Sequence, residues 1–157
     1  MRKAIGESNR MQNFEPQDPA WESRVRSSFE RQSLMNTLNA ELVDLAPGRC
    51  TIRSTYRDGL GQQHGFFHAG VASTIGDSAC GYAAYTLFPP DTDVLSAEFK
   101  INLLEPAKGS ELVATAEVIR KGRRLSVCLA RIEVDPNSAG GRLCAIMLAT
   151  IALVRSK

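Results

Sequence analysis

Residues 68–87 read HAGVASTIGDSACGYAAYTL, and this stretch decides the fold of the chain. Small or apolar residues such as Ile75 and Ala79 occur on every side of it, and Pro89-Pro90 follows it. A helix without a polar face has to be surrounded by protein. We therefore predict one central helix over residues 68–87.

Three glycines fall inside this predicted helix, at Gly70, Gly76 and Gly81. Each costs a helix about 1 kcal/mol relative to alanine. We expect the backbone of another element to pass close to each of them.

The segments around the helix predict strands joined by short turns. Pro47-Gly48 separates two of them, and residues 94–104 alternate, with Leu95 and Phe99 on an apolar face and Ser96 on a polar face. Strands are predicted over residues 40–45, 49–56, 94–104, 111–120, 125–134 and 143–154, after a shorter helix over residues 21–38. The sequence thus predicts an α+β fold in which an antiparallel sheet of five to six strands is wrapped around one long central helix.

Length and composition fit a single core, because 43% of 157 residues gives about 68 apolar side chains. Residues 1–19 are polar and carry Pro16 and Pro19, so we predict a flexible N-terminal tail over 1–19 and one domain over 20–157. No apolar run approaches the roughly 18 residues of a membrane span, and no signal-peptide core opens the chain. We expect a cytoplasmic protein without a membrane partner.

Charge and cysteine content exclude two further classes. Lys and Arg number 19 against 17 Asp and Glu, an excess too small for a protein whose main partner is nucleic acid. Cys50, Cys80, Cys128 and Cys144 form no Cys-x-x-Cys pair. We expect buried, reduced thiols rather than a zinc site or a catalytic disulfide.

One carboxylate stands out. Asp77 lies in the middle of the apolar helix, where a buried carboxylate costs several kcal/mol unless something solvates it. Either a neighbouring hydroxyl such as that of Ser73 or Ser78 satisfies it, or it has a functional role.

The segment QQHGFFHAG, residues 62–70, leads into the helix. The first backbone N–H groups of a helix have no partner within it, so Ala69 and Gly70 offer donors suited to a developing oxyanion, unless solvent alone caps them. His64 and His68 are four residues apart, but Gly65 indicates a loop and the spacing matches no known metal motif, so we expect no metal site.

Lys121-Gly122-Arg123-Arg124 forms a basic turn between two predicted strands. Most such turns are simply solvated, although a pair of arginines beside a cleft can also hold phosphate groups.

Together, the segment from His68 to Asp77, the run SAEFKINLLEPA at residues 96–107 and Lys121-Gly122-Arg123 resemble the hotdog-fold acyl-CoA thioesterases. The similarity runs over residues 34–154 and is greatest to the PaaI-like, phenylacetate-pathway branch of the 4-hydroxybenzoyl-CoA thioesterase-like superfamily. The resemblance implies hydrolysis of an acyl-CoA thioester in homodimers, or tetramers built as dimers of dimers, with active sites between subunits. It implies no cofactor, because coenzyme A is part of the substrate.

The resemblance also implies roles for particular residues. Asp77 is expected to be the general base or the nucleophile, with Ser96 helping to position the attacking water. Gln62 is expected to hold the water or the carbonyl, and His68 to shape the oxyanion loop. Backbone N–H groups of Ala69 and Gly70 of the partner subunit would stabilise the oxyanion, although the family usually has glycine at the position of Ala69. Arg123 and Arg124 would hold the phosphates of coenzyme A.

Phe66, Phe67, Tyr85 and Phe88 are candidates for the walls of an acyl pocket or for ordinary core packing. A non-catalytic acyl-CoA-binding hotdog module is the alternative to an enzyme. Dehydration of a hydroxyacyl thioester is a third possibility, disfavoured because that chemistry usually uses a histidine base where this chain has Asp77.

Overall fold

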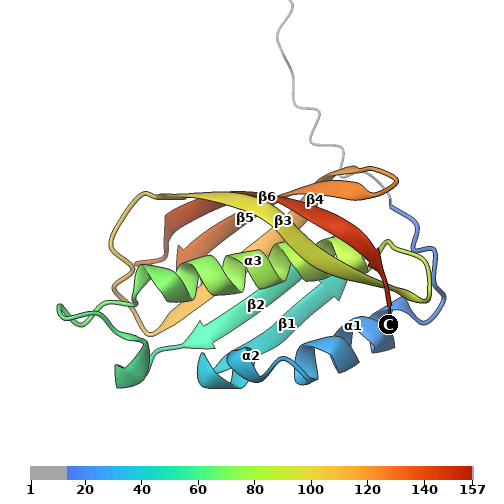
Figure 1. Ribbon diagram of the computed structural model, residues 1–157. Coiled ribbons are helices and arrows are strands. Elements are labelled where there is room, and N and C mark those ends of the chain that lie inside the picture. The colour runs from blue at the N-terminus through green and yellow to red at the C-terminus, as the bar shows by residue number, and fades with distance from the viewer. Residues whose placement is uncertain (1–13, 157) are drawn as a thin grey trace, which may run out of the picture.

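The computed structural model describes residues 14–156, which place a curled antiparallel sheet around one long helix (Figure 1). The elements are α1 (Trp21–Glu30), α2 (Ser33–Thr37), β1 (Ala40–Ala46), β2 (Arg49–Thr55), the short 3-10 helix η1 (Asp58–Leu60), α3 (Ala69–Tyr85), β3 (Thr92–Leu103), β4 (Glu111–Lys121), β5 (Leu125–Val134) and β6 (Arg142–Arg155). The strand order is β1-β2-β4-β5-β6-β3, with every neighbouring pair antiparallel. The expected α+β class, the sheet and the central helix are confirmed, in the hotdog arrangement.

The core lies between α3 and the inner face of the sheet. Ile75 of α3, Ile52 of β2, Ile132 of β5 and Met147 of β6 are all fully buried. Burial of such a side chain contributes about 1.5–3 kcal/mol. This packing fixes the position of α3, and with it the position of Asp77.

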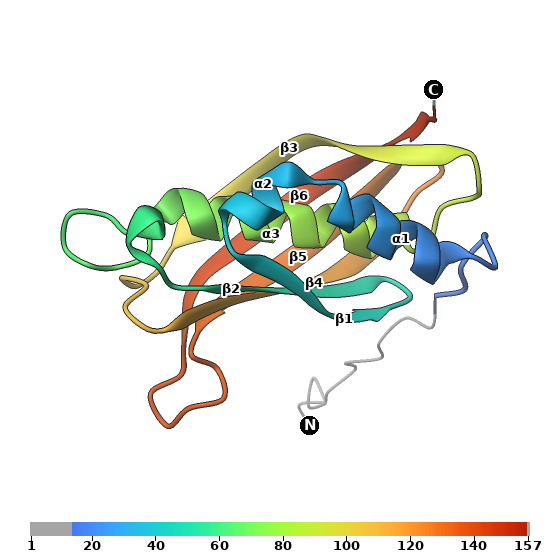
Figure 2. The same ribbon diagram turned by 90° about the horizontal axis from the view of Figure 1, so that it is seen from below.

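Helix α1 lies against α3, and Figure 2 shows α1 and α2 in front of α3. Arg24 of α1 donates hydrogen bonds to the backbone carbonyls of Tyr85 (3.3 Å), Phe88 (2.8 Å) and Pro89 (2.6 Å) at the C-terminal end of α3. Its guanidinium group also lies 4.4 Å from the centre of the Tyr85 ring and pairs with Asp18 at 3.1 Å. Because a cation is favoured at a helix C-terminus, Arg24 fastens α1 onto α3.

Two boundaries differ from the sequence predictions. The helix predicted over residues 21–38 is broken, because Gln32 adopts an extended backbone and accepts a hydrogen bond from the Ser78 hydroxyl at 3.2 Å. Part of the segment 14–19, predicted as tail, is packed: Phe14 lies against the core and Asp18 is buried. Residues 1–13 of the predicted tail lie outside the described residues.

The prediction that the backbone of another element passes close to each helix glycine is wrong. A Cβ atom on Gly76 would lie 3.2–3.3 Å from the side chains of Met147 and Ile132, and one on Gly70 would lie 2.9 Å from the His68 ring. A Cβ atom on Gly81 would meet nothing within 4 Å. Side chains therefore explain Gly76, whereas packing does not explain Gly81.

Strand β3 forms one edge of the sheet and is exposed along most of its length. Its register against β6 shifts between Ser96 and Glu98, which leaves Ala97 as a bulge. Ser96 pairs with Ile151 and Phe99 with Ala149, both buried residues of the inner face of β6. Ser96 and Phe99 therefore share the inner face, and the prediction of a regular half-buried strand with Ser96 on the outer, polar face is wrong.

Candidate active site

Asp77 and Ser96 meet between α3 and β3. The Ser96 hydroxyl donates a hydrogen bond of 2.5 Å to the Asp77 carboxylate. Ser73 and Ser78, the hydroxyls considered as partners from the sequence, bond instead to the Ala69 carbonyl and to Gln32. Asp77 is half-buried, as are Ser73 and Gly81 on the same face of α3, so its carboxylate reaches solvent-accessible space.

The bulge at Ala97 makes this contact possible. Without the extra residue, a strand with Phe99 on the inner face would also have Ala97 and Leu95 there, and Ser96 would point outward. The bulge reverses the alternation, so that Leu95 is 62% exposed and Ser96 faces α3. Alternation in the sequence is a signal for a strand but carries no mark of such an insertion.

A small cavity of about 190 Å³ opens beside Asp77, and we call it the Asp77 recess. It is lined by Ser28 and Gln32 from the N-terminal helices and the turn after α1, Asp77, Ser78, Gly81 and Tyr82 from α3, and Asp93, Val94 and Ser96 from β3. Most of these side chains can form hydrogen bonds, so the recess is polar.

Sequence reasoning missed the polar lining of this recess. Gln32 and Ser28 lie in a segment where only the apolar spacing was informative, and Tyr82 looks like one more core residue in the helix. The one available signal was Gly81, a helix-weakening residue one turn after Asp77.

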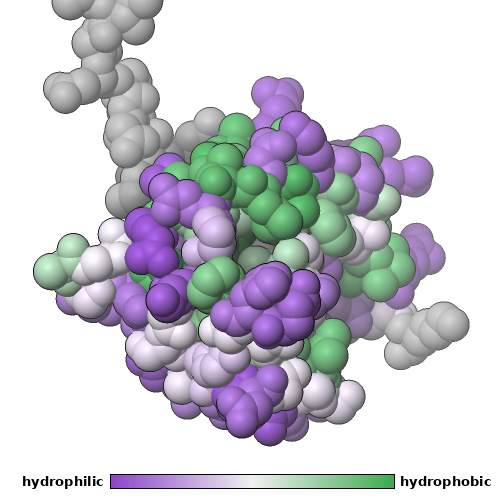
Figure 3. Space-filling view, turned by 90° about the vertical axis from the view of Figure 1, so that its left-hand side faces the viewer, coloured by the Kyte–Doolittle hydropathy of each residue, from purple (hydrophilic) through white to green (hydrophobic). Residues whose placement is uncertain are grey.

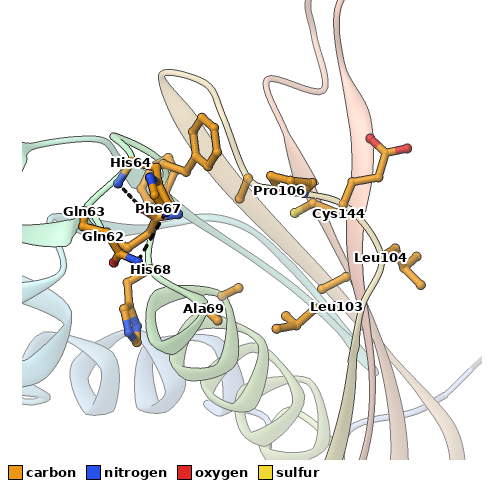
Figure 4. A pocket seen from close by; sticks show the side chains of 15 residues that line it. Gln62, Gln63, His64, Phe67, His68, Ala69, Leu103, Leu104, Pro106 and Cys144 are labelled. Atoms are coloured by element: carbon orange, nitrogen blue, oxygen red, sulfur yellow. Dashed lines mark hydrogen bonds between the residues drawn. The ribbon is translucent and has the colours of Figure 1, made fainter.

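A larger cavity of about 610 Å³ lies at the N-terminal end of α3, and we call it the loop cavity. It is lined by residues of the loop 62–69, by residues 103–107 after β3, and by residues 144–145 of β6, with Ala72 of α3. Figure 3 views this end of the molecule and shows a hollow bordered by hydrophobic residues. Figure 4 shows Gln62, His68 and Ala69 on one side of the cavity and Leu103, Leu104 and Pro106 on the other.

Of the four aromatic candidates for an acyl pocket, Phe66 and Phe67 line the loop cavity. Tyr85 and Phe88 are buried near the C-terminal end of α3, where Arg24 contacts them. The structure therefore brings only the first pair to a cavity.

The two expected oxyanion donors differ in availability. The Gly70 N–H donates to Nδ1 of His68 at 2.8 Å, which makes His68 the N-cap of α3 and uses that donor. The Ala69 N–H has no acceptor among residues 14–156. The donor free to bind a ligand is thus that of Ala69, while His68 shapes the turn that presents it.

Gln62 holds the loop as well as facing the cavity. Its side-chain oxygen accepts a hydrogen bond from the His64 N–H, and its backbone N–H donates to the Phe66 carbonyl at 2.8 Å. Its amide nitrogen makes no hydrogen bond within the described part of the chain, so that nitrogen can donate to a ligand.

Within one chain, Asp77 and Ser96 lie apart from the residues at the N-terminal end of α3. Asp77 lies eight residues after Ala69, about 12 Å along the helix axis. The Asp77 recess and the loop cavity share no lining residue. A single substrate carbonyl therefore cannot contact Asp77 and the Ala69 N–H of the same chain at once.

Arg123 and Arg124 are exposed in the turn between β4 and β5. The Leu153 N–H donates to the Arg124 carbonyl at 2.8 Å, and Val154 pairs with Asp93 of β3. The arginines therefore lie at the end of the sheet where β3 begins, on the same side as Ser96 and away from the loop cavity.

The cysteines and histidines form no further reactive site in residues 14–156. All four cysteines are buried and free, as predicted, and burial raises the pKa of Cys144 to about 11, so its thiol stays protonated at neutral pH. No three His, Cys, Asp or Glu side chains gather in residues 14–156, so His64, His68 and Asp77 form no cluster. No helix in the described range is long and apolar enough to cross a membrane.

Comparisons with known proteins agree with this fold. The family model of the thioesterase superfamily matches residues 64–140. The chain is 43% identical to a thioesterase family protein of Silicibacter pomeroyi, whose crystal structure matches with a TM-score of 0.83 over 87% of this chain and 99% of that protein. The chain belongs to the thioesterase superfamily.

Two further proteins resemble the chain. The 1,4-dihydroxy-2-naphthoyl-CoA hydrolase of Listeria monocytogenes is 25% identical over 124 residues, which cover 79% of this chain and 98% of the relative. The E. coli PaaI protein of the phenylacetic acid degradation operon shares the fold, with a TM-score of 0.77 and 17% identity over 87% of this chain and 95% of that protein. The protein is thus a hotdog-fold member of the thioesterase superfamily, with thioester hydrolysis as its general reaction.

Proposed function

We propose that the protein hydrolyses acyl-CoA thioesters at a site that two copies of the chain complete together. The observation that carries this proposal is the 2.5 Å hydrogen bond between Ser96 and Asp77, made by an edge strand at the mouth of a recess. It gives a fixed carboxylate beside space for a substrate, which is what activation of water requires.

Exposed apolar side chains on β3 support a homodimer. Leu95, Phe99 and Leu103 are 62%, 43% and 57% exposed on an edge strand of 12 residues. Such an edge is prone to pair with another strand. Two-fold pairing of β3 with its copy would run antiparallel, so the beginning of one strand would lie beside the end of the other.

This pairing would unite the two halves of the site. Ser96 lies near the beginning of β3, whereas Leu103 and Leu104 at its end line the loop cavity. The loop cavity of one subunit, with Ala69 at its rim, would face Asp77 of the other. The expectation that the oxyanion donor comes from the partner subunit therefore fits the separation of these residues within one chain.

The proposed reaction needs no group beyond these side chains and water. Asp77 takes a proton from water, the oxygen of which attacks the thioester carbonyl carbon, and the Ala69 N–H of the partner subunit stabilises the oxyanion. The C–S bond then breaks, the proton goes to the departing thiolate, and the free acid and coenzyme A leave. A general base typically contributes 10²–10⁴ in rate, and one oxyanion donor about 3–4 kcal/mol. Direct attack by the Asp77 carboxylate is the alternative role for the same group.

The phosphate groups of coenzyme A would lie toward the beginning of β3. Arg123 and Arg124 are exposed there and can hold phosphate groups. Gln62 would donate from its free amide nitrogen to the carbonyl or to the attacking water.

The first test is thiol release from short, medium, long-chain and aromatic acyl-CoAs. The buried cysteines of the protein itself contribute little background. We expect turnover of at least one substrate and a loss of about 10²-fold or more in Asp77→Asn. The exposed Asp58→Asn is the matched control and should keep wild-type rates. Tight binding without turnover would refute hydrolysis and favour the acyl-CoA-binding module instead.

Ala69 offers a clean test of the oxyanion donor. Ala69→Pro deletes the N–H, yet proline is favoured at the first position of a helix, and His68 before it already has the extended backbone that proline requires. We expect an unchanged melting temperature and a fall in kcat of about 10²–10³. A folded variant with full activity would exclude Ala69 as the donor.

A further inference from the structure

Two charged residues of β3, Glu98 and Lys100, form no ion pair among residues 14–156. Both are exposed, and they pair with Thr150 and Leu148 of β6, which lie on the outer face of the sheet. The Thr150 hydroxyl donates a hydrogen bond of 2.5 Å to one carboxylate oxygen of Glu98. This bond fixes the position of Glu98 and leaves its other carboxylate oxygen available to a partner.

The two faces of the sheet restrict how β3 can pair with a second copy of itself. After the bulge, the residues of β3 on the inner face are those that pair with buried residues of β6, namely Phe99, Ile101 and Leu103. In the proposed two-fold dimer the apolar inner face continues across the joint only if inner residues oppose inner residues. The two-fold axis must therefore pass through one residue of β3, and not between two residues.

Charge distinguishes the axes that remain among residues 98–101. An axis at Glu98 or at Lys100 would place that residue directly opposite its own copy, and like charges in this position destabilise a sheet. An axis at Ile101 would place Lys100 opposite the partner's Asn102 and leave both charges unpaired. An axis at Phe99 places Glu98 opposite the partner's Lys100 and, by symmetry, Lys100 opposite the partner's Glu98. Of these four axes, only the one at Phe99 joins opposite charges.

We infer that two cross-strand ion pairs between Glu98 and Lys100 fix the register of the β3 pairing, with the two-fold axis at Phe99. This inference rests on the dimer of the proposed function and adds which residues of the two chains meet. Phe99 is 43% exposed in the single chain, and at the axis its ring would lie beside its own copy on the inner face.

The register decides whether the divided active site is assembled. Counted from this axis, with the bulge as one extra residue, Ser96 lies opposite the partner's Ile101 on the inner face. Leu103, the next inner residue of the strand, lines the loop cavity. Moving the axis by one residue shifts the partner strand by two residues, about 7 Å, which is more than twice the length of a hydrogen bond. Asp77 and the Ala69 N–H of the partner subunit could then not reach one carbonyl, so Glu98 and Lys100 act as positioning residues.

Single cysteines locate the axis. Only a residue on the axis lies opposite its own copy, within the Cα separation of about 4.4–6.8 Å that a disulfide spans. Glu98, Phe99, Lys100 and Ile101 are each changed to cysteine, and the proteins are oxidised with diamide and compared on non-reducing gels. We expect Phe99→Cys to form the covalent dimer most readily. The four native cysteines are buried, and Leu34→Cys, at an exposed residue of α2, is the control that should not cross-link.

Charge reversal tests the ion pairs themselves. Lys100→Glu and Glu98→Lys each set like charges opposite one another, so each should raise the dimer dissociation constant at least about tenfold at low salt, and less in about 1 M salt. The double variant Glu98→Lys with Lys100→Glu restores both pairs and should recover dimerisation and kcat. Arg131→Glu, at an exposed residue of β5 that β6 separates from β3, is the control and should leave the dimer intact.

The outcomes separate the register from the reaction. Strongest cross-linking at residue 98, 100 or 101, or none at any of the four, would overturn the axis at Phe99. Single charge reversals that dimerise like wild type, or a double variant that stays monomeric, would overturn the ion pairs. Cross-linking and sedimentation need no turnover, so these results leave the proposed hydrolysis standing. A dimer that cross-links at Phe99→Cys but has no wild-type turnover of any acyl-CoA would overturn the hydrolysis alone.

Discussion

Replacing Gly81 by alanine is expected to stabilise the fold and to impair the reaction. The new methyl group would meet no atom within 4 Å, so the change carries no steric cost. The helix gains about 1 kcal/mol from the substitution. For 157 residues the entropy of unfolding is about 0.33 kcal/mol/K, so the melting temperature should rise by about 3 °C. The same methyl group takes space from the Asp77 recess, so kcat/KM for the preferred substrate should fall.

Gly76→Ala is the matched control for this prediction. It gains the same helix propensity, but its Cβ atom would lie 3.2 Å from Met147 and 3.3 Å from Ile132 in the core. We expect little or no gain in melting temperature, because overpacking offsets the helix term. Thermal unfolding followed by circular dichroism and steady-state thiol release measure the two effects. A Gly81→Ala protein that is more stable and fully active on every substrate would refute the idea that the Asp77 recess is space for the substrate.

Three further outcomes are expected. Phe99→Lys places a charge on the exposed edge of β3 and should raise the dimer dissociation constant at least about tenfold in sedimentation analysis, whereas Leu34→Lys, at a similarly exposed residue of α2, should not. Arg123→Ala combined with Arg124→Ala should raise KM for acyl-CoA about tenfold and leave KM for the matching acyl-pantetheine, which lacks the nucleotide, unchanged. Despite partial desolvation, which acts to raise it, the pKa of Asp135 lies below its ordinary value of 3.8 because the Ser110 hydroxyl and the N–H groups of Glu111 and Ser110 donate to it. Its stabilising effect is therefore present above pH 3.8 and lost as the pH falls through the lowered pKa, so the melting-temperature gap between wild type and Asp135→Asn should shrink below about pH 4; a constant gap would contradict this.

The fold was largely accessible from the sequence because its main signals are local. An apolar helix over residues 68–87 and alternating or apolar strands around it leave few arrangements other than a sheet wrapped around that helix. The features that could not be predicted depend on tertiary contacts. The break at Gln32 follows from its hydrogen bond to Ser78, and the packed segment at Phe14 and Asp18 has too few apolar residues to be recognised.

The candidate site was accessible only in part. Asp77 was conspicuous because a charge in an apolar helix needs a reason, but its partner Ser96 comes to the inner face through a bulge that no sequence pattern announces. The hydrogen bond from the Gly70 N–H to the His68 ring could not be predicted from the sequence either, because it depends on the direction of one side chain. Resemblance to a family supplied the roles, whereas geometry decides which donor is free.

The separation of Asp77 from Ala69 along α3 has a consequence for genetics and for engineering. In the proposed dimer each active site contains residues of both chains, so two inactive variants can complement each other. An Asp77→Asn chain and an Ala69→Pro chain, inactive alone, would form hybrid dimers in which one of the two sites is intact. Random assembly of equal amounts would recover about a quarter of wild-type activity, and a tandem fusion of the two chains about half. Activity would then be a property of the dimer, and a mutation in one chain could be compensated by an intact residue in the other.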